Sequence, residues 1–221
     1  KLKPGASFNF GNKGLSAEFI KRQSTRAFLR FSSSQGLEAY LKESGRMPLP
    51  PYIQRPMDTN VQTLELDKKR YQTVFASNEG AIAAPTAGLH FTQSQLANLR
   101  KTTVNTANLT LHVGPGTFVP IRAENFIDHK MEEEYFEVSP FNWNKITLAK
   151  KKGQAILAVG TTSTRVLETQ TFDTSIQERV SGRCNCFIYP GWEFKNVDHL
   201  LTNFHLPKST LFLLICAFMG E

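Results

Sequence analysis

The sequence predicts an α/β main domain preceded by part of a small all-β domain. Three observations lead to this fold class. Apolar residues alternate with charged ones up to residue 34, strand-like and helix-like segments alternate after residue 45, and the segment QAILAVG is apolar without alternation. These patterns are typical of an antiparallel meander, of α/β organisation and of a strand buried on both faces. We therefore expect a basic all-β domain over residues 1–35 and an α/β domain over residues 36–221, with a barrel-like sheet and flanking helices as one form of the latter.

The first domain is expected to contain three strands, ASFNF, LSAEFIKRQ and STRAFLRF, with the turn GNKG between the first two. SSSQG indicates a linker and the cap of a short helix, LEAYLKES, which ends at Gly45. The segment PLPPYI cannot lie inside a helix, because its prolines lack amide donors and fix φ. The polar stretch that follows is expected on the surface up to Tyr71.

The remaining elements are predicted from their caps and from their apolar runs. Thr92 and Gln95 form a capping box that opens a helix ending near Lys101, and the strand ANLTLHV follows. Ser139 as N-cap and Pro140 at the first position predict a helix over SPFNWNKITLAKKKG. QAILAVG then leads into a helix, TTSTRVLET. CFIYPG and LLTNFH repeat the pattern of a strand followed by a break, and PKSTLFLLICAFMG predicts a last buried helix.

Positive charge is concentrated at the N-terminal end. Residues 1–35 carry seven Lys and Arg against one acidic residue, Glu18, whereas the whole chain of 221 residues has a formal net charge of +7. Such a segment is either a surface for a polyanion or ordinary solvated surface. The run LFLLICAFM is too short to span a bilayer, and the first residues lack the features of a signal peptide. Three cysteines fit neither a disulfide framework nor a zinc finger, so we expect a cytoplasmic protein.

The stretch TLHVGPGTFVP ends a predicted strand in a Gly-Pro-Gly turn. Val119 stands where a dinucleotide fingerprint needs its third glycine, and the Lys-Ser/Thr pair of a P-loop is missing. The sequence therefore excludes both nucleotide motifs. It predicts a rigid turn whose backbone can approach a ligand closely.

The segment AVGTTSTR is a candidate for anion binding. Gly160 follows a predicted strand, and the hydroxyl residues after it open a helix, with Arg165 one turn further on. Free amides at a helix N-terminus favour a carboxylate or a phosphate. The alternative is that these residues are an ordinary N-cap.

Three histidines, His90, His112 and His205, follow apolar or aromatic residues at the ends of predicted elements. Histidine suits proton transfer near neutral pH, although a single histidine among leucines is more often a core residue. No two of them have the i, i+4 spacing of a helical zinc site, so zinc is disfavoured. His129 lies in an acidic run and could form an acid/base pair with a nearby carboxylate.

Seven segments resemble, in order, those of the S-adenosylmethionine:tRNA ribosyltransferase-isomerases of the queuosine pathway. They are MPLPPYI, YQTVFA, GAIAAPTAGLHFT, TLHVGPGTFVPIR, AVGTTSTRVLET, FIYPG and TNFHLPKSTL, and they are spread over residues 47–219. Seven such segments in the family's order are highly specific. The chain departs from the family at Glu132, where a second histidine is often found.

The resemblance implies a defined reaction. The ribosyl group of S-adenosylmethionine is transferred to 7-aminomethyl-7-deazaguanine in tRNA and isomerised, which gives epoxyqueuosine-tRNA and releases adenine and methionine. S-adenosylmethionine is then a consumed substrate, and neither a cofactor nor a metal is expected. The sulfonium acidifies the C5′ protons, so that a base can remove one, and an acid can assist the departure of adenine.

The resemblance also implies roles for the residues singled out above. His90 and His112 are the candidate acid and base, and His205 is a third catalytic candidate. The candidate substrate-binding residues are Gly88, Gly114, Gly116, Thr161, Thr162, Thr164 and Arg165. The candidate tRNA-binding residues are Lys13, Lys21, Arg22, Arg26 and Arg30.

We expect the protein to be a monomer. Two other function classes stay open. The first is a non-catalytic RNA-binding relative that keeps the basic strands. The second is an S-adenosylmethionine-dependent methyltransferase. This second class is disfavoured because no acidic residue follows a Gly-rich strand-to-helix turn in the usual arrangement.

Overall fold

The structure is a computed structural model that describes residues 2–10, 14–23, 26–50, 52–114, 120–121, 123–172 and 178–221. The chain divides into two compact units, Lys1–Met47 and Pro48–Glu221. Each unit is described by itself below. The domain boundary predicted after residue 35 stays a prediction.

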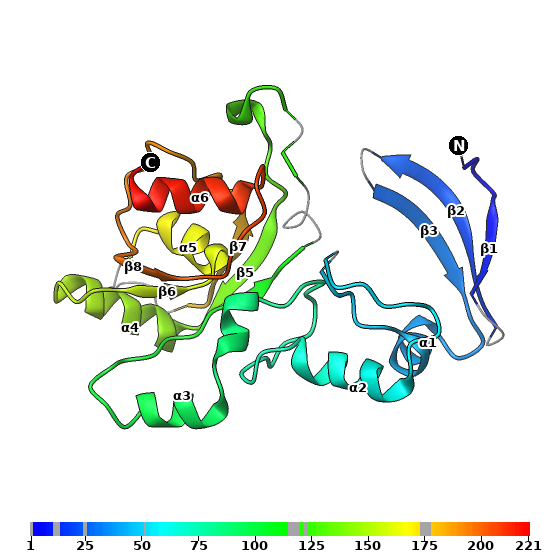
Figure 1. Ribbon diagram of the computed structural model, residues 1–221, viewed down its shortest axis with the longest axis horizontal. Helices are drawn as coiled ribbons and strands as arrows, with labels where there is room; N and C mark the ends of the chain where they lie inside the picture. The colour runs from blue at the N-terminus through cyan, green and yellow to red at the C-terminus, as the bar shows by residue number, and fades with distance from the viewer. Residues whose placement is uncertain are drawn as a thin grey trace. The chain divides into compact units, whose positions relative to one another are not determined.

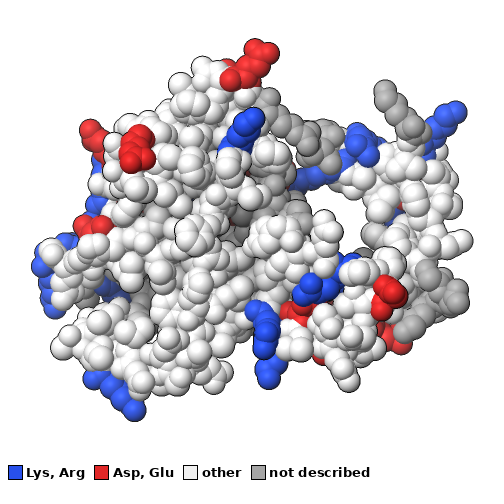
Figure 2. All heavy atoms as spheres, in the orientation of Figure 1, with Lys and Arg blue, Asp and Glu red and all other residues white. Residues whose placement is uncertain are grey.

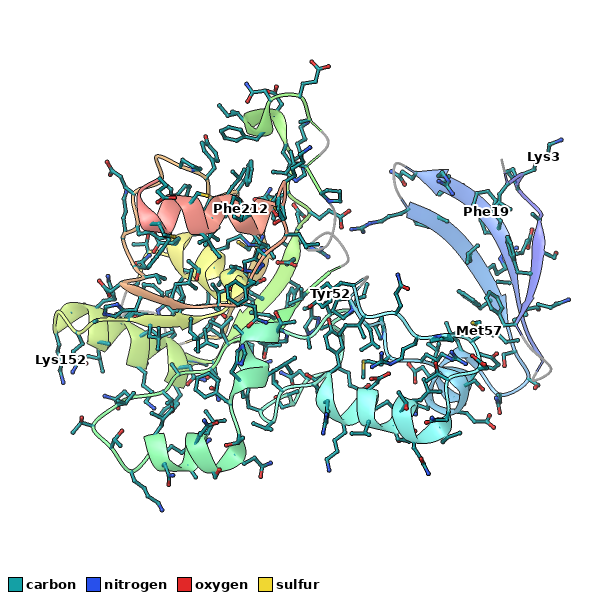
Figure 3. All side chains as sticks on the ribbon, in the orientation of Figure 1. Lys3, Phe19, Tyr52, Met57, Lys152 and Phe212 are labelled. Atoms are coloured by element: carbon teal, nitrogen blue, oxygen red, sulfur yellow. The ribbon has the colours of Figure 1, made fainter. Side chains whose placement is uncertain are left out.

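The first unit is built on a three-stranded antiparallel sheet of order β1-β2-β3 (Figure 1). Its strands are β1 (Ser7–Phe10), β2 (Leu15–Gln23) and β3 (Arg26–Ser32), as the alternation of apolar and charged residues predicted. The central strand β2 buries Leu15, Ala17 and Phe19, the last of which is labelled in Figure 3. The helix α1 (Leu37–Ser44) is fixed to this sheet, because the Tyr40 hydroxyl donates to the carbonyl of Phe10 over 2.9 Å.

The second unit contains two small sheets. Strands β4 (Thr110–His112), β5 (Glu134–Val138) and β7 (Val180–Cys184) form an antiparallel sheet with β5 in the centre. Strands β6 (Leu157–Val159) and β8 (His199–Leu201) form a parallel pair. The mixed α/β class is therefore confirmed. The prediction of a barrel-like sheet was wrong for the described residues. The strands of this unit are three to five residues long and pair in two separate sheets.

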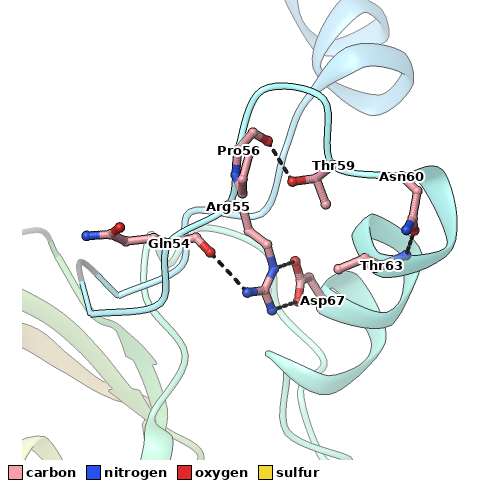
Figure 4. A network of polar contacts seen from close by, with 7 residues as sticks. All are labelled: Gln54, Arg55, Pro56, Thr59, Asn60, Thr63 and Asp67. Atoms are coloured by element: carbon pink, nitrogen blue, oxygen red, sulfur yellow. Dashed lines mark hydrogen bonds and ion pairs between the residues drawn. The ribbon is translucent and has the colours of Figure 1, made fainter.

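Most predicted helices of the second unit are confirmed with their caps. Thr92 and Gln95 form the expected capping box of α3, and Ser139 caps α4. The last helix, α6, begins at Thr210 and not at the proline, with Ser209 as a cap that was not predicted. The segment predicted as polar surface also contains a helix, α2, whose N-cap Asn60 accepts the amide of Thr63 over 2.8 Å (Figure 4). The helices are α2 (Val61–Arg70), η1 (Thr86–His90), α3 (Gln93–Leu99), η3 (Phe126–Asp128), α4 (Pro140–Lys151), α5 (Thr161–Glu168) and α6 (Thr210–Met219).

Helix α5 packs against both sheets of this unit. Val166 lies in one buried cluster with Phe136 of β5, and Leu167 lies in another with Ala158 of β6. Burying side chains of this size on both sides of a short helix is what stabilises it, since an isolated helix of eight residues is marginal in water. The position of α5 is therefore fixed by the core.

The C-terminal end of α5 is held by a second device. The carboxylate of Glu168 accepts three successive backbone amides, those of Lys195 (2.9 Å), Asn196 (2.9 Å) and Val197 (2.8 Å). These residues immediately precede β8. The Asn196 side chain also donates to the carbonyl of Leu167 over 2.7 Å.

Two expectations about strands were wrong. QAILAVG does not form a strand buried on both faces: β6 buries Ala158, but Leu157 is 55% exposed. CFIYPG forms no strand; β7 ends at Cys184, before this segment. Ile188 is nevertheless buried there, which explains its apolar character.

Candidate functional site

Two parallel strands end at the same edge of a sheet and bring together the segments that follow them. Val159 of β6 pairs with Leu201 of β8, and the amide of Gly160 donates to the carbonyl of Leu201 over 2.9 Å. Helix α5 follows β6, and residues 202–205 follow β8. Because ligands of open α/β sheets bind outside the carboxyl ends of the strands, this edge is the candidate site.

His90 is held by the segment that follows β8. Its Nε2 lies 2.6 Å from Oδ1 of Asn203, and the residue is exposed to solvent. The turn that carries His90, η1, lies beside the start of α5. The Cβ of Ala87 is 3.9 Å from the point where a Cβ on Gly160 would stand. His90 is therefore placed at the edge where β6 and β8 end.

His205 is held by the same segment. Its Nε2 lies 2.9 Å from the Thr202 hydroxyl, and the residue is half-buried. Burial lowers the pKa of His205, so its imidazole is mostly neutral at pH 7. The structure thus joins His90 and His205 through residues 202–205.

His112, the last residue of β4, is held by other elements. Its ring lies 5.3 Å from the ring of Tyr135, its neighbour on β5, and packs against the backbone of Gly80. The segment with Gly80 runs beside the end of β4, because Ile82 and Ala83 both donate their amides to the carbonyl of Val113. His112 belongs to the antiparallel sheet, whereas the other two histidines are joined at the parallel pair.

The N-terminus of α5 is buried. Its N-cap, Gly160, has a φ of 96° and no side chain to cap the helix, so the first amides meet no side-chain acceptor from that residue. Thr161, Thr162 and Thr164 are all buried. The hydroxyl of Thr164 donates to the carbonyl of Gly160 over 3.1 Å.

Arg165 joins this helix to the end of β4 through a buried ion pair. The side chain is 2% exposed and pairs with Glu134 of β5, which is 4% exposed. Nη2 of Arg165 also lies 3.3 Å from the Thr162 hydroxyl, while Oε1 of Glu134 accepts the amide of Gly114 over 3.3 Å. Within the described residues, Nε and Nη1 of Arg165 are buried without a hydrogen-bond partner.

The candidate glycines differ in their surroundings. Among the described residues, no atom lies within 4 Å of the point where a Cβ on Gly114 would stand. A Cβ on Gly88 would stand 2.8 Å from both Thr73 and Phe75. Glycine is therefore needed at this position because the two side chains leave no room for a larger residue. Gly116 lies outside the described residues.

The basic candidates of the first unit lie on strands β2 and β3, and Lys and Arg side chains are blue in Figure 2. Lys21 lies over the ring of Phe28, 5.0 Å from its centroid, and Arg30 pairs with Glu18 at 3.3 Å. Lys21 and Arg22 also line a groove of about 450 Å³. Arg26 begins β3 and is exposed, and Lys13 lies outside the described residues.

Three residues of the site escaped sequence reasoning. Asn203 stands two positions before His205, but nothing in the sequence indicates that its side chain contacts His90. Gly80 was not singled out, because a lone glycine carries no signal of a ring packed on it. Glu134 is the last of three consecutive glutamates, a pattern typical of solvated surface. Its place as the first of the alternating residues EYFEV, whose buried members are Glu134, Phe136 and Val138, was the available signal.

In the part of the chain that the structure describes, no group of three or more His, Cys, Asp or Glu side chains is arranged to hold a metal ion. Among the same residues, no helix is long and apolar enough to cross a membrane. His129 packs edge-on against Phe187, with 5.5 Å between the ring centroids.

Comparison with known proteins gives a consistent result. The family model described as "Queuosine biosynthesis protein" matches residues 1–221. The chain is 44% identical over 222 residues to the S-adenosylmethionine:tRNA ribosyltransferase-isomerase of Clostridium kluyveri, covering 100% of this chain and 63% of that protein. It is 48% identical over 193 residues to the protein of the same name from Halothermothrix orenii, covering 87% and 54%.

A solved structure is also similar. It is the crystal structure of S-adenosylmethionine tRNA ribosyltransferase from Thermotoga maritima, with 29% identity and a TM-score of 0.47, covering 100% of this chain and 57% of that one. The chain thus spans less than two thirds of the length of the relatives named here.

Proposed function

The chain belongs to the queuosine biosynthesis protein family, and from this premise we propose that it is a tRNA ribosyltransferase-isomerase. It transfers and isomerises the ribosyl moiety of S-adenosylmethionine onto 7-aminomethyl-7-deazaguanine in tRNA, giving epoxyqueuosine-tRNA with release of adenine and methionine. The observation that carries this proposal is the similarity of the full chain to relatives of that name at 44–46% identity.

In the proposed reaction, histidines move the protons. A base takes a C5′ proton beside the sulfonium, and an acid delivers a proton to adenine as it leaves. His90 and His112 are our candidates for these roles, and His205 is the third. The exposure of His90 at the strand edge supports its access to substrate, and the lowered pKa of His205 supports a neutral imidazole that can accept a proton.

The N-terminus of α5 is the proposed anion site. Thr161, Thr162, Thr164 and Arg165 would hold the methionine carboxylate or a tRNA phosphate. Support comes from the helix start without a side-chain cap and from the two guanidinium nitrogens of Arg165 that lack a partner among the described residues. Gly114, beside which no described atom would meet a Cβ within 4 Å, would let backbone approach the ribose, with Gly88 and Gly116 as further candidates for close approach.

The first unit is the proposed tRNA-binding part. Lys13, Lys21, Arg22, Arg26 and Arg30 would contact phosphates, and the exposed side chains of the four described residues support this. We propose that these strands belong to a small all-β domain and that the protein acts as a cytoplasmic monomer. S-adenosylmethionine would be consumed, without a resident cofactor or metal.

The test is adenine release from S-adenosylmethionine, followed by chromatography, with and without tRNA that carries 7-aminomethyl-7-deazaguanine. The proposal expects adenine only when the modified tRNA is present. A protein that shifts the mobility of tRNA but releases no adenine would instead be the non-catalytic RNA-binding relative. S-adenosylhomocysteine as product would indicate methyl transfer.

A further inference from the structure

The contact between His90 and Asn203 assigns different roles to the two ring nitrogens. Nε2 of His90 lies 2.6 Å from Oδ1 of Asn203. An amide oxygen only accepts hydrogen bonds, so Nε2 must carry the hydrogen. A neutral imidazole has one hydrogen on its nitrogens, and Nδ1 therefore has the lone pair.

We propose that Asn203 is a positioning residue that fixes the tautomer and orientation of His90, leaving Nδ1 as the atom that exchanges a proton with substrate. This inference rests on the proposed function, in which His90 is an acid or a base. In its neutral form the ring accepts a proton at Nδ1. In its charged form it returns that same proton, while Nε2–H stays bonded to Asn203 in both forms. An orienting partner of this kind keeps the reactive nitrogen in place through a proton-transfer cycle.

The surroundings of Asn203 make it suited to this role. On one side, Leu201 is paired with Val159 in the parallel sheet and accepts the amide of Gly160 over 2.9 Å. On the other side, Thr202 and His205 are joined at 2.9 Å, which closes the segment on itself. Asn203 is half-buried, whereas His90 is exposed. The amide is thus held by the sheet, and the imidazole is held by the amide.

The choice of an amide has a consequence for charge. Asparagine is neutral at every pH, so it orients the ring without adding a negative charge beside it. A carboxylate at the same position would keep an acceptor oxygen but would favour the charged imidazolium. Asn203→Asp therefore preserves the hydrogen bond, and Asn203→Leu, of similar size, removes it.

The first test reads the tautomer directly, without any activity. Long-range ¹H–¹⁵N spectra of the histidine rings are recorded at a pH well above the ordinary histidine pKa of about 6.5. His90→Gln identifies the signals of His90. We expect hydrogen on Nε2 alone in the wild type, a mixture of both tautomers in Asn203→Leu, and the wild-type pattern in Asn203→Asp. Asn98→Leu, at an exposed position of α3, is the matched control and should change nothing.

The second test uses adenine release. Asn203→Leu should lower kcat by up to about a hundredfold, as expected for a reactive group misplaced by about 1 Å. KM for S-adenosylmethionine should stay within about twofold, because Asn203 does not itself bind this substrate in the proposal. Asn203→Asp should recover most of kcat.

Three results would overturn the inference: hydrogen on Nδ1 of His90 in the wild type, identical His90 spectra in wild type and Asn203→Leu, or a kcat loss that Asn203→Asp does not recover. If Asn203→Leu fails to fold, the inference is still tested by the tautomer of His90 in the wild type and by the comparison of the wild type with Asn203→Asp. A wild-type protein that releases no adenine contradicts the proposed function. The tautomer of His90 is measured without activity, so it tests the role of Asn203 independently of that result.

Discussion

The imidazole of His112 lies directly on the backbone of Gly80, so that a Cβ at Gly80 would stand 2.6 Å from Nδ1 of the ring. No side chain fits in this space, and the φ of 138° at Gly80 is a conformation that other residues avoid. Two independent constraints therefore require glycine here.

Replacing Gly80 by alanine should displace His112. We expect Gly80→Ala to lose about 1–3 kcal/mol of stability through its backbone strain and to lower adenine release at least about tenfold if His112 moves a proton in the reaction. Urea unfolding and chromatography measure the two effects. Gly191→Ala is the matched control, since its φ is 96° but a Cβ there meets no atom of the described residues within 4 Å. A control that loses activity equally would show that strain, and not the ring, is responsible.

The buried pair of Glu134 and Arg165 should be costly to break. Glu134→Gln leaves the guanidinium without its counter-charge in the core, and we expect a loss of about 3–5 kcal/mol in the free energy of unfolding. The double variant Glu134→Gln, Arg165→Met should lose less than the sum of the single changes, because it buries no uncompensated charge. Denaturant unfolding of all three variants tests this.

The neighbouring acidic residue provides the control. Glu133 pairs with Arg183 at 3.9 Å between largely exposed side chains, so Glu133→Gln should change stability by less than about 1 kcal/mol. Equal losses for Glu133→Gln and Glu134→Gln would contradict the distinction between the two pairs.

The pair of Arg55 and Asp67 should make the free energy of unfolding depend on pH in the acid range. Two hydrogen bonds of 2.8 Å join the guanidinium to both carboxylate oxygens (Figure 4), and they lower the pKa of Asp67. The pKa of Asp67 in the folded protein therefore lies below the ordinary value of about 3.9. The pair contributes fully to the free energy of unfolding above about pH 3.9, and this contribution is lost as the pH falls through the folded pKa. Arg55→Leu should flatten this part of the stability profile, whereas Lys68→Ala, which removes an exposed pair with Glu65, should leave it unchanged.

The burial of His205 should make stability depend on pH in the same direction as Asp67 does, but in a higher pH range, because here burial disfavours the charged form of the ring. Its folded pKa is lowered by burial, so the unfolded chain binds the proton more readily. The neutral ring therefore contributes stability above the ordinary value of about 6.5, and this contribution is lost as the pH falls below it. Unfolding of the wild type and His205→Gln at about pH 7.5 and about pH 5 should show a smaller pH dependence in the variant. An identical difference in both proteins would exclude this titration.

Binding of tRNA should depend steeply on salt. Arg22→Ala should weaken binding and reduce the slope of log K against log salt by about 0.7–0.9 for each phosphate that the variant no longer neutralises. Arg30→Ala should have less effect, because this side chain pairs with Glu18. Filter binding over a range of salt concentrations measures the slopes. Lys152→Ala, at the end of α4 (labelled in Figure 3), is the control that should leave the slope unchanged.

Local signals in the sequence predicted the helices well. Ser139 and Pro140 placed the start of α4, and the pair Thr92 and Gln95 placed that of α3, because a cap is a contact between residues three apart. Helix α5 followed from Gly160 and the hydroxyl residues after it. The strands were predicted less well, since β6 has three residues and its pairing with β8 joins positions more than forty residues apart.

The sequence indicated residue types for a candidate site but not the contacts between them. The three histidines were singled out by their positions at element ends, and the similarity of the chain to its relatives supports the family. The partners Asn203, Gly80 and Glu134 each lie more than twenty residues from His90, His112 and Arg165, respectively. Only folding brings them together, so no spacing in the sequence could indicate them.

Glu168 gives helix α5 a second point of attachment to the chain that forms β8. The first is the bond from Gly160 to Leu201 at the start of the helix, and the second is the set of amides that Glu168 accepts at its end. A rotation of α5 that opened its N-terminus would have to break both. Helix α5 and strand β8 are therefore expected to stay together in any movement of this edge.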